Sequence, residues 1–215
     1  MVATEMAHLL VFFTSSLLTF FAAYETVLIP LMVIIGQGGS GAGRLRAALL
    51  FFIYTLAGSI SILLAVLYLI GSTGEILNCG SEALVSLTLT QPSASILWVA
   101  FGVSFAVKTP LYPFLVWLIH AHAEAPLEGS IILAGVVLKL AIFGVSALLV
   151  GLLWEGGLVT LSYSLSLSLA TLLLASGAMV QQIDLKGFVA LSSVAHMGLG
   201  TLGILSLTED GTVGS

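Results

Sequence analysis

Charged residues are scarce in this 215-residue sequence. Five Lys or Arg and ten Asp or Glu make up 7% of the chain, whereas an ordinary soluble domain is about 25% charged. So few charges cannot cover the surface of a water-soluble globule of this size. Hydrophobic residues make up 59% of the chain, and the mean hydropathy is +1.21. The composition therefore predicts a protein whose solvent is lipid.

Basic residues and cysteines are scarcer still. The net charge of −5 reflects few basic residues, so no basic patch exists to neutralise phosphates, and nucleic-acid binding is excluded. The single cysteine, Cys79, excludes an intrachain disulfide framework and any multi-cysteine cluster. The sequence also lacks a dinucleotide glycine fingerprint, a P-loop and a cysteine motif for haem or iron–sulfur clusters. We therefore expect neither a redox cofactor nor a metal in this chain.

Long apolar runs fill most of the sequence. A spanning helix needs about 20 mostly apolar residues, and the runs lack the alternation of a membrane barrel. We expect an all-α, polytopic transmembrane helix bundle, a single domain over residues 1–215, with about six spans: 9–35, 47–70, 95–119, 128–150, 158–180 and 187–207. The first run fits either one tilted helix or a short helix followed by a second at Ser15-Ser16, and we prefer the single helix.

The charges between the spans predict an orientation. Arg44 and Arg46, and later Asp184 and Lys186, fall on one side of a six-span arrangement. Basic residues near span ends mark the cytoplasmic or matrix side of the membrane. We therefore expect both chain ends on the opposite face of the membrane. Lipids are expected as partners of the spans.

Ionisable residues inside the predicted spans carry the most information. Glu25 and Lys139 lie deep in apolar runs, where a charge on an isolated helix costs at least about 2.5–3.5 kcal/mol. Lys108 is followed by Pro110 and Pro113, which predict a broken helix, because proline removes a backbone donor and disfavours helix in the residue before it. Intramembrane charges beside broken helices mark ion or proton paths. A permanent ion pair that holds helices together is the alternative.

Three histidines are weaker candidates. His196 lies within the last span, where packing and proton relay are equally compatible with its surroundings. His120 and His122 follow the third span, where an interfacial role is favoured over catalysis. With Glu124 they alternate at a spacing of two, which does not share a helical face, so a metal site is not favoured.

Several runs of this sequence resemble a known family. The order and content of the runs are similar to the antiporter-like membrane subunits of the proton-pumping NADH:ubiquinone oxidoreductase, respiratory complex I, above all its chain 4. The resemblance covers nearly the whole chain and rests on residues 25–31 (ETVLIPL), 52–59 (FIYTLAGS), 105–113 (FAVKTPLYP), 133–140 (LAGVVLKL) and 192–197 (SSVAHM).

The resemblance implies both a fold and a function. It implies the antiporter-like helix bundle, with Glu25 as the family's glutamate on an early helix, Lys108 as its broken-helix partner and Lys139 as the central lysine of the proton channel. His196, His120 and His122 are then possible relay residues. The chain would be a non-redox subunit of an H⁺-translocating NADH:ubiquinone reductase, not catalytic alone, while NADH, FMN, iron–sulfur clusters and ubiquinone belong to the rest of the complex.

Departures from the family leave alternatives open. A histidine of the family's pattern is replaced by Leu115, and His120 is a possible substitute. The family member is about twice this length, which implies that other membrane-arm subunits, or a separate chain, replace the missing helices. A non-conducting structural subunit of the same arm and a cation/proton antiporter-related subunit are the alternatives. The resemblance favours the mitochondrial inner membrane, with the bacterial plasma membrane as the alternative.

Overall fold

The chain folds into an all-helical bundle, as predicted. The computed structural model describes residues 2–39, 41–73, 91–150 and 160–214, so Cys79 lies outside the described part. The regular elements in the described part are the helices α1 (Val2–Phe13), α2 (Leu17–Thr26), α3 (Leu28–Gly38), α4 (Arg44–Thr73), α6 (Gln91–Lys108), α7 (Val116–Glu124), α8 (Leu127–Ile132), η1 (Leu133–Val137), α9 (Leu138–Gly144), η2 (Val145–Val150), α11 (Leu161–Val180), α12 (Leu185–Leu205) and α13 (Glu209–Gly214).

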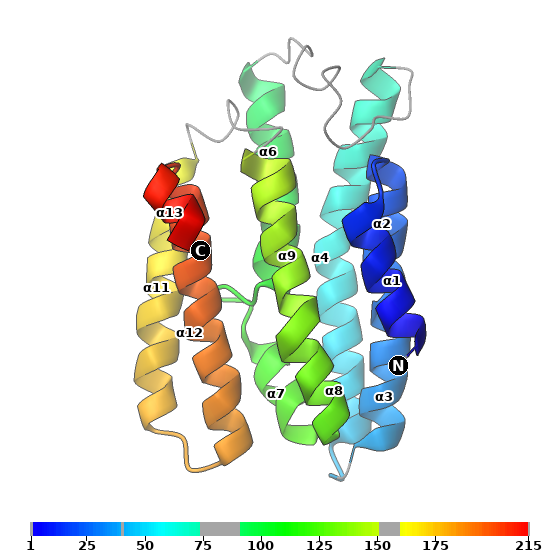
Figure 1. The fold of residues 1–215 in the computed structure, drawn as a ribbon, viewed down its shortest axis with the longest axis vertical. Coiled ribbons are helices and arrows are strands. Elements are labelled where there is room, and N and C mark those ends of the chain that lie inside the picture. Colours follow the sequence, from blue (N-terminus) through cyan, green and yellow to red (C-terminus); the bar gives the residue numbers. More distant parts are fainter. Residues whose placement is uncertain (1, 40, 74–90, 151–159, 215) are drawn as a thin grey trace.

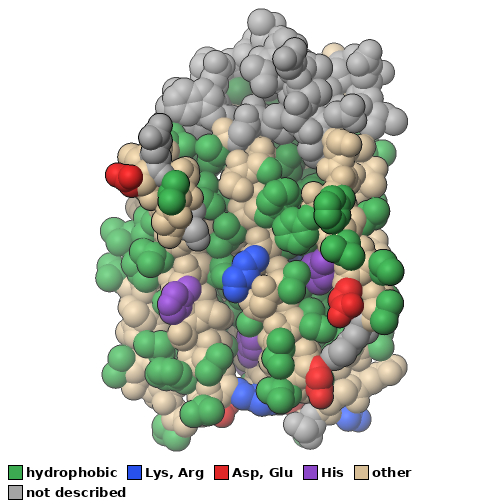
Figure 2. Space-filling view, in the orientation of Figure 1, with side chains coloured by type: hydrophobic (Ala, Val, Ile, Leu, Met, Phe, Trp, Pro, Cys, Tyr) green, Lys and Arg blue, Asp and Glu red, His purple; other side chains and the backbone are tan. Residues whose placement is uncertain are grey.

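The long helices stand side by side along one axis (Figure 1). Within the described part, five are long and apolar enough to cross a membrane: Leu17–Gly38, Arg44–Ser72, Leu127–Val150, Leu161–Val180 and Leu185–Leu205. Large apolar side chains remain exposed along them, and hydrophobic residues are spread over the face drawn in Figure 2. Such a surface is stable only in lipid, and the chain is a multi-pass membrane protein.

The third predicted span is not one continuous helix. Its first half, α6, ends at Lys108, and α7 begins only at Val116. Pro110 and Pro113 lie in the gap and interrupt the backbone hydrogen-bond ladder. The break predicted near Lys108 is therefore confirmed.

The first predicted span, 9–35, is wrong as a single helix. The helix α1 ends at Phe13, Ser16 has an extended backbone (φ −89°, ψ 129°), and α2 starts at Leu17. The hydroxyl of Thr14 lies 3.5 Å from the carbonyl oxygen of Ser16, and short polar side chains of this kind compete with helical hydrogen bonds. Hydropathy missed the break because both flanks are apolar. The alternative of a short helix followed by a second one describes the fold.

The basic connections gather at one end of the bundle. The turns before α4 and α12 both lie at the lower end in Figure 1. Arg44 and Arg46 are in the first turn of α4, and Lys186 is in the first turn of α12. The helix α13 lies at the opposite end, as predicted for the C-terminal side. The start of α1 lies part-way along the bundle instead, because α1 forms a separate helix that runs back against α2.

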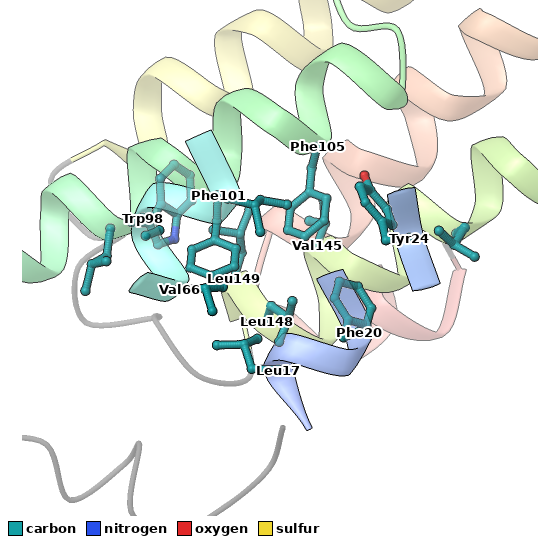
Figure 3. Packing of buried hydrophobic residues seen from close by; sticks show 14 of the residues in the cluster. Leu17, Phe20, Tyr24, Val66, Trp98, Phe101, Phe105, Val145, Leu148 and Leu149 are labelled. Carbon is teal, nitrogen blue, oxygen red and sulfur yellow. The ribbon is translucent and has the colours of Figure 1, made fainter. Parts of the chain in front are cut away.

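Two apolar clusters form the core. The first contains Phe20, Tyr24, Phe101, Phe105 and Leu148, which converge from α2, α6 and η2 (Figure 3). The second contains, among others, Val27, Leu28, Phe51, Trp117 and Leu138. Tyr24 belongs to the first cluster and Val27 to the second, and Glu25 lies between them in the sequence. Glu25 therefore lies in a layer of residues at the boundary between the two clusters.

Candidate functional site

Glu25 lies where a second helix is interrupted. The helix α2 ends at Thr26 and α3 begins at Leu28. Pro30 has no N–H to donate to the carbonyl of Thr26, and the next bond, from the N–H of Leu31 to the carbonyl of Val27, is long at 3.5 Å. Glu25 therefore comes from one interrupted helix and Lys108 from another.

Lys108 and Glu25 form a buried ion pair. The distance from Lys108 Nζ to Glu25 Oε1 is 3.7 Å, with 2% of the lysine side chain and 18% of the glutamate side chain exposed. Lys108 Nζ also donates to the carbonyl oxygen of Tyr24 at 3.0 Å and lies 3.1 Å from the centroid of the Tyr24 ring. A carboxylate, a carbonyl and an aromatic face together compensate the desolvated ammonium. The structure thus brings together two of the three main predicted residues.

Other polar groups surround the pair without completing its hydrogen bonds. Ser59 of α4 interacts with the carboxylate of Glu25, and Ser104 of α6 with the hydroxyl of Tyr24. Even so, neither carboxylate oxygen of Glu25, nor the two hydroxyls of Tyr24 and Ser104, forms a hydrogen bond of ordinary geometry within the described residues. Buried polar atoms are normally satisfied by protein or by ordered water, so this layer has the chemistry of a hydrated site.

The break after Lys108 is stabilised by side chains. The indole N–H of Trp117 donates to the carbonyl of Val107 at 2.9 Å, and the N–H of Tyr112 donates to the hydroxyl of Thr171 in α11 at 2.8 Å. Irregular backbone at membrane depth persists only where its polar groups find partners. The loop is therefore held in place, and with it the end of α6 that carries Lys108.

Replacing Trp117 by Phe tests this role. Trp117 is fully buried, so the variant leaves the carbonyl of Val107 without its donor, and we expect a loss of about 1–3 kcal/mol of stability. The measurement is the thermal unfolding midpoint of the protein in detergent. Trp98→Phe is the control, because Trp98 is also buried but its indole donates no hydrogen bond within the described part. Equal destabilisation by both variants would mean that volume, not the hydrogen bond, matters.

Lys139 does not join the pair. It lies in the middle of the span Leu127–Val150, on α9, but its side chain is exposed on the outside of the bundle. Its Nζ donates to the carbonyl of Ala134 at 3.1 Å, in the π-helical segment η1. Lys139 thus lies deep in its span, as predicted, but the described neighbouring helices do not cover it. An apolar run in the sequence reports depth along a helix and not which face neighbours cover.

The three predicted histidines have different environments. His122 of α7 is buried, with 4% of its surface exposed, and interacts electrostatically with Lys186. His120 is exposed, and His196 is exposed on α12, where its Nδ1 lies 2.7 Å from the carbonyl of Ser192. No group of three His, Cys, Asp or Glu residues that could hold a metal occurs among residues 2–39, 41–73, 91–150 and 160–214.

Sequence reasoning missed His8. We assigned His8 no role from the sequence, yet it is 5% exposed on α1 and interacts electrostatically with Lys108. Its signal was a histidine within the apolar run Ala7-His8-Leu9-Leu10, which becomes informative only once α1 is known to fold back on α2.

These features define a polytopic helical membrane protein built around a buried ion pair at two interrupted helices. The chain belongs to the family described as "NADH:quinone oxidoreductase/Mrp antiporter, TM", whose profile matches residues 14–215. It is 40% identical over 205 residues to NADH-ubiquinone oxidoreductase chain 4 of Marchantia polymorpha, covering 95% of this chain and 41% of the relative. To chain 4 of Mycosarcoma maydis it is 44% identical over 209 residues, covering 95% and 42%. The predicted resemblance is confirmed.

Solved structures share the fold. Respiratory complex I from Thermus thermophilus with bound NADH contains a chain that superposes with a TM-score of 0.84 at 31% identity, covering 93% of this chain and 42% of the other. The Mrp complex from Dietzia sp. DQ12-45-1b gives a TM-score of 0.83 at 20% identity, covering 98% and 23%, a likeness of fold alone. The chain spans about two fifths of the length of the curated relatives.

Proposed function

We propose that this chain is a proton-translocating part of the membrane arm of NADH:ubiquinone oxidoreductase. The observation that carries the proposal is the buried pair Glu25–Lys108, 3.7 Å apart, at the meeting point of two interrupted helices. Support comes from relatives at 40–44% identity that are named NADH-ubiquinone oxidoreductase chain 4. Charges inside a membrane are retained for transport or for a permanent structural pair.

The pair can exist in two protonation arrangements. Glu25 and Lys108 form an ion pair or, after a proton moves from Nζ to the carboxylate, a neutral pair. Burial disfavours both charges, whereas each charge favours the other, so the two arrangements approach each other in free energy. A proton that arrives at Glu25 weakens its attraction for Lys108, which then releases its own proton toward Lys139. Electron transfer elsewhere in the complex supplies the energy and sets the direction.

Redox chemistry is assigned to other subunits. NADH, FMN, the iron–sulfur clusters and ubiquinone belong, in this proposal, to the rest of the complex, and this chain acts in the enzyme without catalysing a reaction alone. His196, His120 and His122 are secondary relay candidates. Of these, only His122 is buried in the described part, which favours it over the other two for a path inside this chain.

Lys139 requires covering helices beyond the described residues. It is exposed halfway along its span, where a charge against lipid costs about 2.5–3.5 kcal/mol on an isolated helix. We propose that further helices of the family's length, or helices of neighbouring membrane-arm subunits, pack over α9 and α12. The second half of the proton path then lies between this chain and its cover.

One observation favours a second function. Lys139 has no acidic partner within the described residues, so this part of the chain holds only the Glu25–Lys108 part of a path. A non-conducting structural subunit of the same arm is therefore the alternative, and a cation/proton antiporter-related subunit is a further one that shares the fold. The proposed location is the mitochondrial inner membrane, with the bacterial plasma membrane as the alternative.

Glu25→Gln tests the proposed function. Gln retains the size and polarity of the side chain but cannot exchange a proton, so we expect NADH-driven acidification of membrane vesicles to fall about tenfold or more while assembly on native gels is retained. Glu5→Gln is the matched control, because Glu5 is an exposed glutamate on α1. Unchanged acidification in assembled Glu25→Gln complex would reject the transport function and favour the structural subunit.

A further inference from the structure

His8 lies on the one face of α1 that is buried in the bundle. The buried residues of α1 are Thr4, Ala7, His8 and Val11, a spacing of three and four residues that places them on one side of the helix. Ala7 packs into the second apolar cluster, and Val11 packs into the first. His8 therefore lies on the buried face of α1, between a residue of the first cluster and a residue of the second.

The hydrogen bond of His8 determines which ring nitrogen can exchange a proton. Its Nδ1 lies 2.6 Å from the carbonyl oxygen of Thr4, and because a carbonyl only accepts, Nδ1 must carry the hydrogen. The other nitrogen, Nε2, then holds a lone pair when the ring is neutral and a second N–H when it is protonated. Nε2 is buried and has no hydrogen-bond partner within the described residues.

His8 lies within electrostatic range of the Glu25–Lys108 pair. Lys108 interacts electrostatically with His8, and Lys108 in turn contacts Glu25 and Tyr24. The two carboxylate oxygens of Glu25 and the hydroxyls of Tyr24 and Ser104 share with Nε2 the property of being buried without a hydrogen bond among the described residues. Buried polar atoms without a protein partner are where ordered water is bound in proteins.

We propose that His8 is the third proton-exchanging group of this site and passes protons from α1 to Glu25 through bound water. In this step the Nε2–H of the imidazolium gives its proton to a water molecule, which gives one to the Glu25 carboxylate. The products are a neutral imidazole, a neutral carboxylic acid and an unchanged water. The inference rests on the proposed function and adds to it the group that protonates Glu25.

The positive charge of Lys108 suits His8 to relaying rather than storing a proton. A protonated ring beside a protonated lysine is disfavoured by like-charge repulsion, whereas transfer to the carboxylate removes a buried charge from each partner. A proton on His8 is therefore short-lived, and Glu25 is its acceptor.

The test compares His8→Gln, His8→Ala and the control Glu5→Gln, in the assembled complex in membrane vesicles. Gln keeps a polar side chain but cannot carry a proton, so we expect acidification per complex to fall about tenfold. This is less than the roughly 100-fold of a typical acid–base group, because water carries part of the flux. In His8→Ala we expect added imidazole to restore at least half of the loss. A structural role alone would not give such rescue.

The outcomes separate this inference from the proposed function. Unchanged acidification in His8→Gln together with loss in Glu25→Gln would overturn the relay and leave the function standing. Unchanged acidification in both variants would overturn both. If His8→Gln lowers assembly, acidification rates are normalised to the amount of complex present, and the imidazole experiment decides. A loss of acidification in His8→Ala that added imidazole does not restore would also overturn the relay.

Discussion

We expect the variant Lys108→Met to abolish NADH-driven proton translocation and to lower the amount of assembled protein. The reason is that Lys108 Nζ lies 3.7 Å from Glu25 Oε1 in a buried layer, and removing one partner leaves the other as an unpaired buried charge. Breaking a buried pair in this way costs about 3–5 kcal/mol. The expected result is a lower unfolding midpoint and less complex on native gels, with no measurable acidification of vesicles.

The double variant Lys108→Met/Glu25→Gln separates stability from transport. With both charges removed, no unpaired charge remains, so we expect assembly to recover to near the unmodified level while acidification stays absent. Recovery of both assembly and acidification would show that the pair is a permanent structural bridge. Failure of the double variant to recover assembly would show that the contacts of Lys108 with Tyr24 matter more than its pairing with Glu25.

The part of the fold that depends on local chemistry was predictable. Pro110 and Pro113 predicted the break after Lys108 because proline acts within one turn of its own position. The later spans were predictable because a continuous apolar run of about 20 residues has few alternatives to a spanning helix. The break at Thr14 to Ser16 was predictable only as an alternative, since its signal is three small polar residues whose effect on a helix depends on the segment that follows.

The part of the site that depends on helix packing was not predictable from the residues. Glu25 and Lys108 are 83 positions apart in the sequence, and only the resemblance to the family paired them. The burial of His8 follows from α1 folding back on α2, and the exposure of Lys139 follows from which face of α9 its neighbours cover. Periodicity places a residue on a face of its helix, but it does not say which helix lies opposite.

We expect the variant Lys139→Met to reduce proton translocation about tenfold or more in a complex that still assembles. Met retains most of the length of the lysine stem, and the charge that it removes is expensive within a membrane, so packing against a covering segment is not weakened. The single side-chain hydrogen bond of Lys139 in the described part goes to Ala134 of its own span, and its loss leaves contacts between helices unchanged. The measurement is vesicle acidification per assembled complex.

Two comparisons make the Lys139 result specific. Arg46→Gln removes an exposed basic residue at the end of the bundle and should leave acidification unchanged. Lys139→Arg keeps the positive charge, but Arg holds its proton throughout the physiological pH range. If Lys139 must release a proton, this variant should be as defective as Lys139→Met. If only the charge matters, its acidification should be near normal. Full acidification by Lys139→Met would mean that protons leaving Lys108 do not pass α9, and that this face serves to hold the chain against its neighbours.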